Sequence, residues 1–454
     1  METRTRIIEH DIQKEDEKKY LLLPLAIPDG TEIIEIKVGY SGDEASSTVT
    51  DKEKNVIDFA LADENGDDIG ASGSNTRTIV VSKNYASDGY KRKEPKGTWQ
   101  IIVGCYQIKQ SGSKVRYEVK FTPKAYRYLK GDLHMHTTNS DGKYTYGQLT
   151  EKARRKGLDF IFITDHNNST EDLPIPRVNG LTVVEGLELT NYDGHINLLG
   201  VKKPYDGSYA VGSLDRLNEI LKQAKANGAV RILNHPFCSM CPINWNLDDV
   251  DYDGIEIWNG PVNIKEMKAV DWWQKKLESG FHIPVVGGSD YHRDYYITDL
   301  LASPTTKVWC DSNDKQTILE AIKNGHCVIT RNPKSTMLDI RCGEAAVGDT
   351  VKLAKNEKKR VTITAVGMKK GHKLQVFSQT GLIFEYSNKS GNQYSYTAEA
   401  SVSGFIRAQI VFRKKFFSRM LHKAVVRSLS IEEAKKPLPE LLYAITNPIY
   451  FETD

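Results

Sequence analysis

The sequence predicts an α/β domain in the middle of the chain, with a β-rich segment on each side of it. Residues 131–330 alternate short apolar runs with amphipathic stretches, which is typical of repeated strand–helix units. The flanking segments instead carry short apolar runs between Gly, Asp, Asn and Ser clusters, with no convincing helical period. At 454 residues the chain has room for about three domains. We expect these domains at 1–128, 129–330 and 331–454.

In the N-terminal segment, strands are predicted at 32–38, 56–61, 78–81 and 99–103. Turn-rich stretches such as ADENGDDIGASGSN lie between them. Short strands joined by such turns predict a β-sandwich-like domain. We place the junction to the next domain at 124–130.

In the central segment, six short apolar runs predict strands and three amphipathic stretches predict helices. The clearest helix covers 213–227, where Ser213 is a suitable N-cap and Gly228 ends the apolar stripe. Repeated strand–helix units predict parallel strands, arranged as a barrel or as an open doubly wound sheet. The predicted strands lie at 159–164, 181–186, 195–200, 229–234, 254–259 and 282–288, and the helices at 213–227, 265–279 and 315–324.

The C-terminal segment returns to strand patterns, at 361–366, 374–377 and 405–412. Lys369, Lys370 and the basic run at 413–415 give it positive charge. We interpret these side chains as the solvated face of a second β-sandwich-like domain.

The overall composition excludes several classes of protein. Lys and Arg number 62 against 59 Asp and Glu, and this near balance gives no indication of a nucleic-acid or membrane partner. No apolar run approaches the ~18 residues of a membrane span. The first residues lack the apolar core of a signal peptide, and the six cysteines show no disulfide spacing. We therefore expect a cytoplasmic protein with reduced thiols.

The 11 histidines are concentrated in the central segment, where seven lie between residues 134 and 292. Most of them lie in short polar motifs at the ends of apolar runs, and catalytic groups of α/β folds lie at strand C-termini. His134 and His136 are two residues apart, so an extended chain presents both on one face. Any one of these histidines, taken alone, could be a buried, hydrogen-bonded side chain without a functional role. The full set of candidate metal ligands is His134, His136, Asp141, His166, Glu188, His195, His235, Asp290 and His292.

This set of polar groups predicts a metal centre. Burying so many unpaired polar groups costs several kcal/mol for each charge unless ions or partners satisfy them. Imidazole and carboxylate together suit zinc, manganese or iron rather than calcium. Because three or four protein ligands usually hold one ion, the set indicates about two or three divalent ions.

The motifs DLHMHT, TDH, NHP and GSDYH resemble the four motifs of the PHP (polymerase and histidinol phosphatase) metal-dependent hydrolases. A β-rich segment on each side resembles the CehA/McbA type within that superfamily. The resemblance covers roughly 131–330 and implies a metal-dependent hydrolase with a distorted (β/α)7 barrel. It further implies one ion on His134, His136 and Asp290, a bridging Glu188 in preference to Glu185, a second ion on His195 and His235, and a third on Asp141, His166 and His292.

The expected reaction is hydrolysis, in which a water that bridges two ions attacks the substrate. A small phosphomonoester or phosphodiester is favoured, because its oxygens can each meet a cation. The CehA/McbA resemblance keeps hydrolysis of a carbamate, amide or carboxylic ester open as the alternative. A nuclease is disfavoured because residues 131–330 carry no clear basic stripe. A non-enzymatic binding role stays open for the flanking segments alone.

Other residues have more specific expected roles. Glu188, Asp165 and Asp290 are the candidate catalytic carboxylates, with Asp165 orienting His166. Trp258, Asn259 and Arg293 are candidate substrate contacts, although each could equally belong to the scaffold. Cys238 and Cys241 are interpreted as two reduced loop cysteines, since no second Cys pair completes a zinc site.

Overall fold

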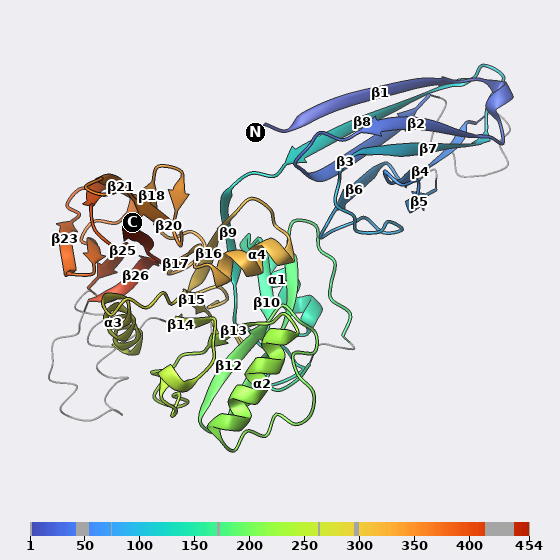
Figure 1. The fold of residues 1–454 in the computed structure, drawn as a ribbon. Helices are drawn as coiled ribbons and strands as arrows, with labels where there is room; N and C mark the ends of the chain where they lie inside the picture. The colour runs from blue at the N-terminus through green and yellow to red at the C-terminus, as the bar shows by residue number, and fades with distance from the viewer. Residues whose placement is uncertain are drawn as a thin grey trace. The chain divides into compact units, whose positions relative to one another are not determined.

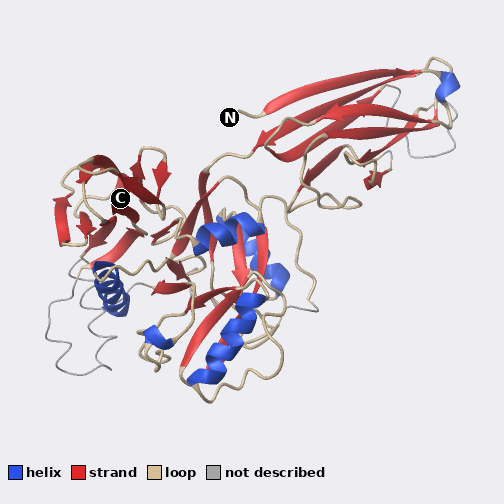
Figure 2. Ribbon diagram, viewed as in Figure 1, coloured by secondary structure: helices blue, strands red, loops and turns tan. Residues whose placement is uncertain are grey.

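The computed structural model describes residues 2–41, 54–73, 75–169, 173–261, 264–294, 299–413 and 440–453. It shows a mixed α/β protein with many strands and few helices (Figures 1 and 2). The chain divides into two compact units, Met1–Tyr126 with Arg177–Thr182, and Arg127–Pro176 with Val183–Asp454. The second unit therefore contains both the central and the C-terminal segments, and their separation into two domains stays a prediction.

The first unit contains two four-stranded antiparallel sheets whose inner faces share one apolar core. Alternation is clearest in β7, where Trp99, Ile101 and Val103 point inward between partly exposed neighbours. One sheet has the order β1 (Arg4–Ile12), β8 (Ser113–Pro123), β3 (Thr31–Tyr40), β6 (Thr78–Ser82). The other has the order β2 (Tyr20–Ala26), β7 (Thr98–Gln107), β4 (Val56–Ala62), β5 (Asp68–Ser72), and a 3-10 helix η1 spans Lys14–Asp16.

In the second unit, seven strands form the part of a large sheet that carries the predicted site. Their order is β15 (Val285–Gly288), β14 (Gly254–Asn259), β13 (Val230–Leu233), β12 (Gly194–Leu199), β11 (Thr182–Asn191), β10 (Phe160–Ile163) and β9 (Arg127–Asp132). The expected parallel pairing holds for β9 with β10 and for β13, β14 and β15. It is wrong for β12, which runs antiparallel to both β11 and β13. A two-residue hairpin between Asn191 and Gly194 imposes this direction.

Four α-helices lie in the described part of the chain, all in the second unit: α1 (Tyr146–Lys156), α2 (Leu214–Ala226), α3 (Ile264–Glu278) and α4 (Lys315–Lys323). The helices predicted at 213–227, 265–279 and 315–324 are confirmed as α2, α3 and α4. In α2, Ser213 caps the first turn by accepting from Arg216 N, as its sequence position predicts. No described helix is long and apolar enough to cross a membrane. A 3-10 helix η2 spans Leu247–Asp249.

The large sheet continues from β9 into the C-terminal segment, where a second sheet packs against it around a further apolar core. The continuing strands are β16 (Thr305–Cys310), β17 (Cys327–Thr330), β26 (Leu441–Thr446), β25 (Gly404–Phe412), β22 (Lys373–Ser378) and β23 (Gly381–Ser387), with β20 (Thr350–Leu353) and β27 (Ile449–Thr453) beside them. The second sheet has the order β19 (Ala345–Ala346), β18 (Met337–Cys342), β21 (Lys359–Met368), β24 (Asn392–Ala400). Of the basic run at 413–415, only Arg413 belongs to the described residues, where it pairs with Glu440.

The last strand of the seven, β15, is fixed by side chains on the edge that faces away from β14. Gly287 N donates to Thr306 Oγ1 in β16 at 2.9 Å, and Val285 N donates to Asn447 Oδ1 at 2.8 Å. The Asn447 amide also donates to Val285 O at 2.8 Å and to Cys327 O at 3.0 Å. The sheet therefore curls back so that β15 meets β16. This fixes the direction in which the chain leaves β15.

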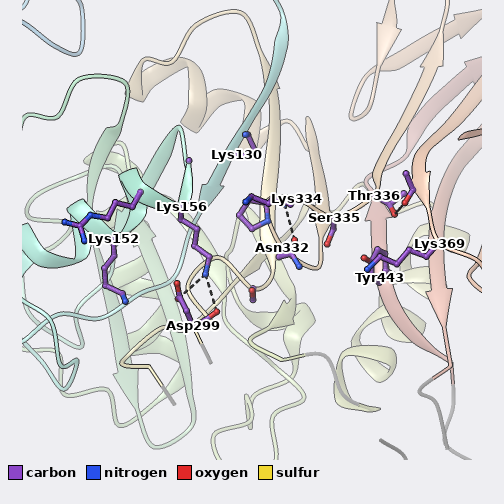
Figure 3. A pocket seen from close by; sticks show the side chains of 15 residues that line it. Lys130, Lys152, Lys156, Asp299, Asn332, Lys334, Ser335, Thr336, Lys369 and Tyr443 are labelled. Carbon is purple, nitrogen blue, oxygen red and sulfur yellow. Dashed lines mark hydrogen bonds and ion pairs between the residues drawn. The ribbon is translucent and has the colours of Figure 1, made fainter. Parts of the chain in front are cut away.

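A cavity of about 970 Å³ in the second unit lies between the C-terminal end of α1 and residues of the C-terminal segment (Figure 3). Lys130 of β9 and Tyr443 of β26 also line it. None of the predicted metal ligands belongs to its lining.

We expect Asn447→Ala to lower the free energy of unfolding by about 2–5 kcal/mol, because it leaves the buried N–H and C=O of Val285 without partners. Urea unfolding followed by tryptophan fluorescence measures this loss. Asn244→Ala, at an exposed position, is the matched control and should change the free energy by less than about 0.5 kcal/mol. Equal stability of the two variants would contradict the role of Asn447.

Candidate metal centre

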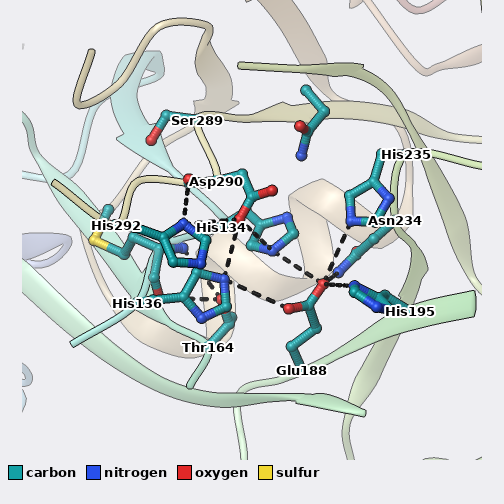
Figure 4. A network of polar contacts seen from close by, with 12 residues as sticks. His134, His136, Thr164, Glu188, His195, Asn234, His235, Ser289, Asp290 and His292 are labelled. Atoms are coloured by element: carbon teal, nitrogen blue, oxygen red, sulfur yellow. Dashed lines mark hydrogen bonds and ion pairs between the residues drawn. The ribbon is translucent and has the colours of Figure 1, made fainter. Parts of the chain in front are cut away.

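The nine predicted ligands fall into overlapping groups at one edge of the seven-stranded part of the sheet. Figure 4 shows most of them around Glu188. His134 and His136 follow the end of β9, His166 follows β10, His235 follows β13, and Asp290 and His292 follow β15. His195 lies instead at the beginning of β12. Because β12 is antiparallel to its neighbours, its first residues reach the edge where the other strands end. The reversed strand thus still delivers its histidine to the site.

Glu188, on β11, is the carboxylate that the histidines surround. Its side chain is fully buried, with Oε1 at 3.1 Å from both His134 Nε2 and His195 Nδ1. Its Oε2 lies 2.8 Å from His166 Nδ1. The Asn234 side-chain amide donates to Oε1 at 2.7 Å. These contacts give Glu188 the central position that the sequence analysis expected of a bridging carboxylate.

Glu185, the other glutamate considered for this role, lies away from the imidazoles. Its carboxylate forms an ion pair with Lys315 at 2.6 Å, at the start of α4. Residues 185 and 188 therefore have different surroundings, although both belong to β11.

The carboxylate of Glu256, which the sequence analysis did not single out, orients His134. Glu256 is 2% exposed on β14, and its Oε1 lies 3.2 Å from His134 Nδ1. Its Oε2 accepts from the backbone N–H of His235 at 3.1 Å and from Asn259 Nδ2 at 3.0 Å. A carboxylate on the far nitrogen of an imidazole fixes the ring and directs the other nitrogen toward an ion. The available signal was a charged residue inside the apolar run GIEIWN, since buried charge requires partners.

Asp290 and Asp141 are the two aspartates of the cluster, and both lie close to His292. Asp290 Oδ1 is 3.1 Å from His136 Nε2 and 3.5 Å from His292 Nδ1. Asp141 is 58% exposed, and its Oδ1 is 3.1 Å from His292 Nε2. His136, Asp141, His166 and His292 thus form one group whose donor atoms lie within 4.8 Å of one another. It contains the complete third set of predicted ligands.

Missing hydrogen bonds give a second indication that the side chains of the cluster bind divalent ions. His134 Nε2, His136 Nδ1 and Glu188 Oε2 are buried without a hydrogen bond of acceptable geometry among the described residues. Buried polar atoms are rarely left in this state. Nitrogen and oxygen donors in such number suit zinc, manganese or iron. The overlapping groups His134–His136–Glu188, His166–Glu188–His195 and His134–His235–Asp290 are each compact enough to hold one ion.

The carboxylates and imidazoles shift one another's pKa strongly. Burial alone would raise the pKa of Glu188, but the positive charge of His134 and the hydrogen bonds from His134, His166 and His195 together outweigh it and hold that pKa well below its usual range. Burial would lower the pKa of His235, yet the contact with Glu188 raises it to about 9. Burial would also lower the pKa of His134, which Glu188 and Asp290 instead raise well above the usual value. Without an ion, the cluster therefore holds protons that compensate its carboxylates.

Two aspartates position the loops that carry the ligands. Asp165 accepts from Thr137 N, Thr137 Oγ1 and Ser140 Oγ, each at 2.7 Å. The expected contact of Asp165 with the His166 ring is wrong, because His166 Nδ1 lies against Thr190 Oγ1 at 2.6 Å and Glu188. Asp165 instead holds the turn that precedes Asp141.

Asp132, which the sequence analysis did not consider, has the corresponding role for the segment after β15. Its Oδ1 accepts from Ser289 N at 2.9 Å, and its Oδ2 accepts from Ala302 N at 2.7 Å. It is fully buried at the end of β9. The carboxylate therefore links the end of β9 to the residue that precedes Asp290.

The three candidate substrate contacts occupy different surroundings. Trp258 is 1% exposed within the apolar core, and its indole N–H donates to Gly260 O at 3.1 Å. This burial favours the scaffold role of Trp258 over the substrate contact. Asn259 lines a cavity of about 200 Å³ together with His235. Arg293 is exposed and directly follows His292.

Cys241 lies closer to the cluster than the sequence analysis expected. Its Sγ is 3.7 Å from His235 Nδ1 and 3.5 Å from Cys238 Sγ. With His195 and His235 it forms a further group that could hold an ion. The hydrogen bond from Cys241 lowers the pKa of Cys238 to about 4. The interpretation as two unremarkable loop cysteines is therefore too simple for Cys241.

Comparison with known proteins shows that residues 132–233, which include several of the predicted ligands, match the PHP domain family. MJ1587, an uncharacterized protein of Methanocaldococcus jannaschii, is 27% identical over 146 residues, which cover 29% of this chain and 82% of MJ1587. A probable phosphatase of Citrobacter koseri is 29% identical over 136 residues, which cover 25% of this chain and 56% of the phosphatase. The chain thus spans about half the length of that phosphatase.

A solved structure from Bacteroides vulgatus, described as a two-domain protein containing a predicted PHP-like metal-dependent phosphoesterase, has a TM-score of 0.39 and 20% identity. The alignment covers 63% of this chain and 90% of that one. The PHP domain match ends at residue 233 and so precedes His235, Asp290 and His292. The match is consistent with an enzyme.

Three glutamine variants test the different surroundings of the glutamates. We expect Glu188→Gln to reduce the number of ions bound per chain, because it removes the negative charge that the histidines surround. Glu256→Gln should weaken binding about 10–100-fold through loss of the His134 orientation. Glu185→Gln, on the same strand, is the control and should bind metal like the parent. Elemental analysis after dialysis measures all three, and metal loss in Glu185→Gln alone would contradict the assignment.

Metal binding should release protons near neutral pH. An ion requires neutral imidazole, whereas the raised pKa of about 9 keeps His235 protonated in the metal-free chain. Affinity should therefore rise with pH between about 6 and 8, by about tenfold per pH unit for each proton displaced. Titration calorimetry in buffers of different ionisation enthalpy counts these protons. Affinity that is independent of pH, with no proton release, would contradict the charge balance described here.

Proposed function

We propose that residues 129–330 form a distorted (β/α)7 barrel of PHP type that hydrolyses a small phosphomonoester or phosphodiester. The observation that carries this proposal is the convergence of six histidines on Glu188, Asp290 and Asp141 at one strand edge. A parallel bridge between Met135, which follows β9, and Tyr291, which follows β15, joins the two ends of the seven-strand order and supports a closed barrel. The PHP domain match at 132–233 supports hydrolysis. The cofactors would be two or three ions of zinc, manganese or iron.

Divalent ions bound here would supply Lewis acidity and lower the pKa of a water. The chain's own residues set the positions at which this chemistry takes place. Glu188 holds the histidines of four strands together, and Glu256 fixes the ring of His134. Asp165 holds the turn before Asp141, an exposed carboxylate at the rim of the site. Each role requires a fixed side chain, because ions demand defined donor geometry.

An anionic substrate fits the exposed side of the cluster. His292 is partly exposed beside Asp141, and Arg293 follows it at the surface. A guanidinium can bind a phosphate through two parallel hydrogen bonds. A phosphoester also offers a group of ions several non-bridging oxygens that share negative charge, whereas the carbonyl of an amide or carbamate offers one neutral oxygen. These features favour a phosphoester over an amide or carbamate.

The alternative is hydrolysis of a carbamate, amide or carboxylic ester, as in the CehA/McbA type. The cavity of about 200 Å³ beside His235 supports it, because its lining is partly apolar. Phe237, Met240 and Ile257 contribute to that lining. Such a cavity could take the apolar part of an aryl ester or carbamate.

A panel of substrates distinguishes the two chemistries. On metal-replete protein we expect turnover of p-nitrophenyl phosphate or bis-p-nitrophenyl phosphate, measured by p-nitrophenolate release. Turnover of aryl carbamates or carboxylic esters alone would contradict the phosphoesterase and support the alternative.

His136→Ala should lose bound metal and activity together, because this ring contacts both Asp290 and Glu188. A loss of at least about 100-fold in kcat/KM is expected, since metal-ligand loss removes both activation of water and charge stabilisation. His282→Ala, a histidine outside the cluster, is the control and should keep both. Retention of metal and activity by His136→Ala would contradict the proposal.

A further inference from the structure

The cavity of about 970 Å³ has an unusual excess of positive charge (Figure 3). We call it the basic pocket. Asp299 is the single carboxylate among its lining residues, and six basic side chains line it: Lys130, Lys152, Arg155, Lys156, Lys334 and Lys369.

Half of these cations form no ion pair in the part of the chain that the structure describes. Three are paired at 2.8–3.0 Å: Lys152 with Asp294, Arg155 with Glu151, and Lys156 with Asp299. Across the described ranges, the structure gives no ion pair to Lys130, Lys334 or Lys369. The charge of Lys130 does act on the nearby Asp159 carboxylate, which accepts from the Lys130 backbone N–H at 2.7 Å. Like charges that converge on one concave volume repel one another, and low-dielectric walls strengthen their field. The pocket therefore attracts anions.

A fourth lysine without an ion pair among the described residues, Lys307, lies buried next to Lys130 of the pocket. It pairs in register with Lys130 between β16 and β9, so both side chains project from the same face of the sheet. Lys307 is 6% exposed, and its ammonium lies 3.6 Å from Met337 Sδ, with no carboxylate partner in the described part of the chain. Burial and then the charge of Lys130 lower the pKa of Lys307 to about 8. A buried, uncompensated ammonium is costly, and a nearby anion would reduce that cost.

The pocket also offers a neutral hydrogen-bond donor. Ser335 Oγ is buried without a hydrogen-bond partner among the described residues. The neighbouring Thr336 hydroxyl is already used, because it donates to Gly367 O at 2.8 Å. Ser335 lines the pocket between Lys334 and Thr336. Its hydroxyl can therefore donate to an oxyanion beside the lysines.

We propose that the basic pocket binds a small molecule that carries two phosphate-type groups. In Figure 3, Lys152 and Lys156 of α1 form one wall, and Lys369 belongs to the opposite wall near Tyr443. The lysines without an ion pair among the described residues are also spread over the pocket, because Lys130 belongs to β9 and Lys369 lies over Tyr443 of β26, with β16 and β17 between these two strands. A ligand that compensates both therefore needs two anionic groups. Lysines bind phosphate as point charges, and the volume suits a metabolite-sized ligand. The site is separate from the metal centre and does not rest on the hydrolytic function.

Two matched phosphonates test this site, because phosphoesterases do not cleave their P–C bonds. Titration calorimetry on the full chain compares 1,6-hexylenediphosphonic acid with hexylphosphonic acid. We expect the diphosphonate to bind at least about tenfold more tightly. In the double variant Lys334→Gln/Lys369→Gln, its affinity should fall about tenfold. Lys334→Arg/Lys369→Arg should retain most of it.

Lys355→Gln is the control, since this exposed lysine lies on the C-terminal segment outside the pocket. It should bind the diphosphonate like the parent, and turnover at the metal centre should be unchanged in every lysine variant. Equal affinity for the two phosphonates would overturn the proposal. So would unchanged affinity in Lys334→Gln/Lys369→Gln, which would place the binding at the metal ions. Preference for an oligothymidylate over the diphosphonate would also overturn it and identify a nucleic-acid surface.

Discussion

The burial of one carboxylate among imidazoles is the constraint on which the rest of this structure depends. Glu188 is fully buried, and histidine nitrogens lie 2.8–3.6 Å from its oxygens: those of His134, His136, His166, His195 and His235. A buried carboxylate is stable only if protonated histidines or bound metal ions compensate its negative charge. The strands that supply those rings must therefore end, or in the case of β12 begin, at one place. The curl of the sheet, the reversed β12 and the links from Asn447 to β15 all serve that requirement.

The sequence predicted the members of the cluster because the relevant signal is local. A polar residue directly after an apolar strand lies at the sheet edge whichever strand neighbours it, as His166 and His235 do. Glu256, Asn234 and Asp132 were missed because their roles depend on which buried side chain faces them. Trp258 followed the strand-end pattern and yet packs into the core. The sequence pattern of one strand does not show which of its two faces becomes buried when the sheet curls.

The fold was predictable where one face of an element is buried and less so elsewhere. The helix α2 has a clean apolar stripe and a cap, and its position agreed with the sequence pattern to within a residue. β1 was missed because its residues are mostly exposed and its sequence, RTRIIEHDI, does not alternate. The direction of β12 depends on a two-residue hairpin that repeated strand–helix units did not suggest. Strand pairing is a long-range property, so a local pattern cannot give it.

The metal centre is the central claim, and anomalous X-ray diffraction from crystals of the metal-replete protein tests it most directly. Data collected on both sides of the zinc, manganese and iron absorption edges would locate and identify each ion. The account predicts two or three anomalous peaks, with one in contact with Glu188 and His134 and one beside Asp141 and His292. An ordered histidine cluster with no anomalous peak at any of the three edges would contradict it.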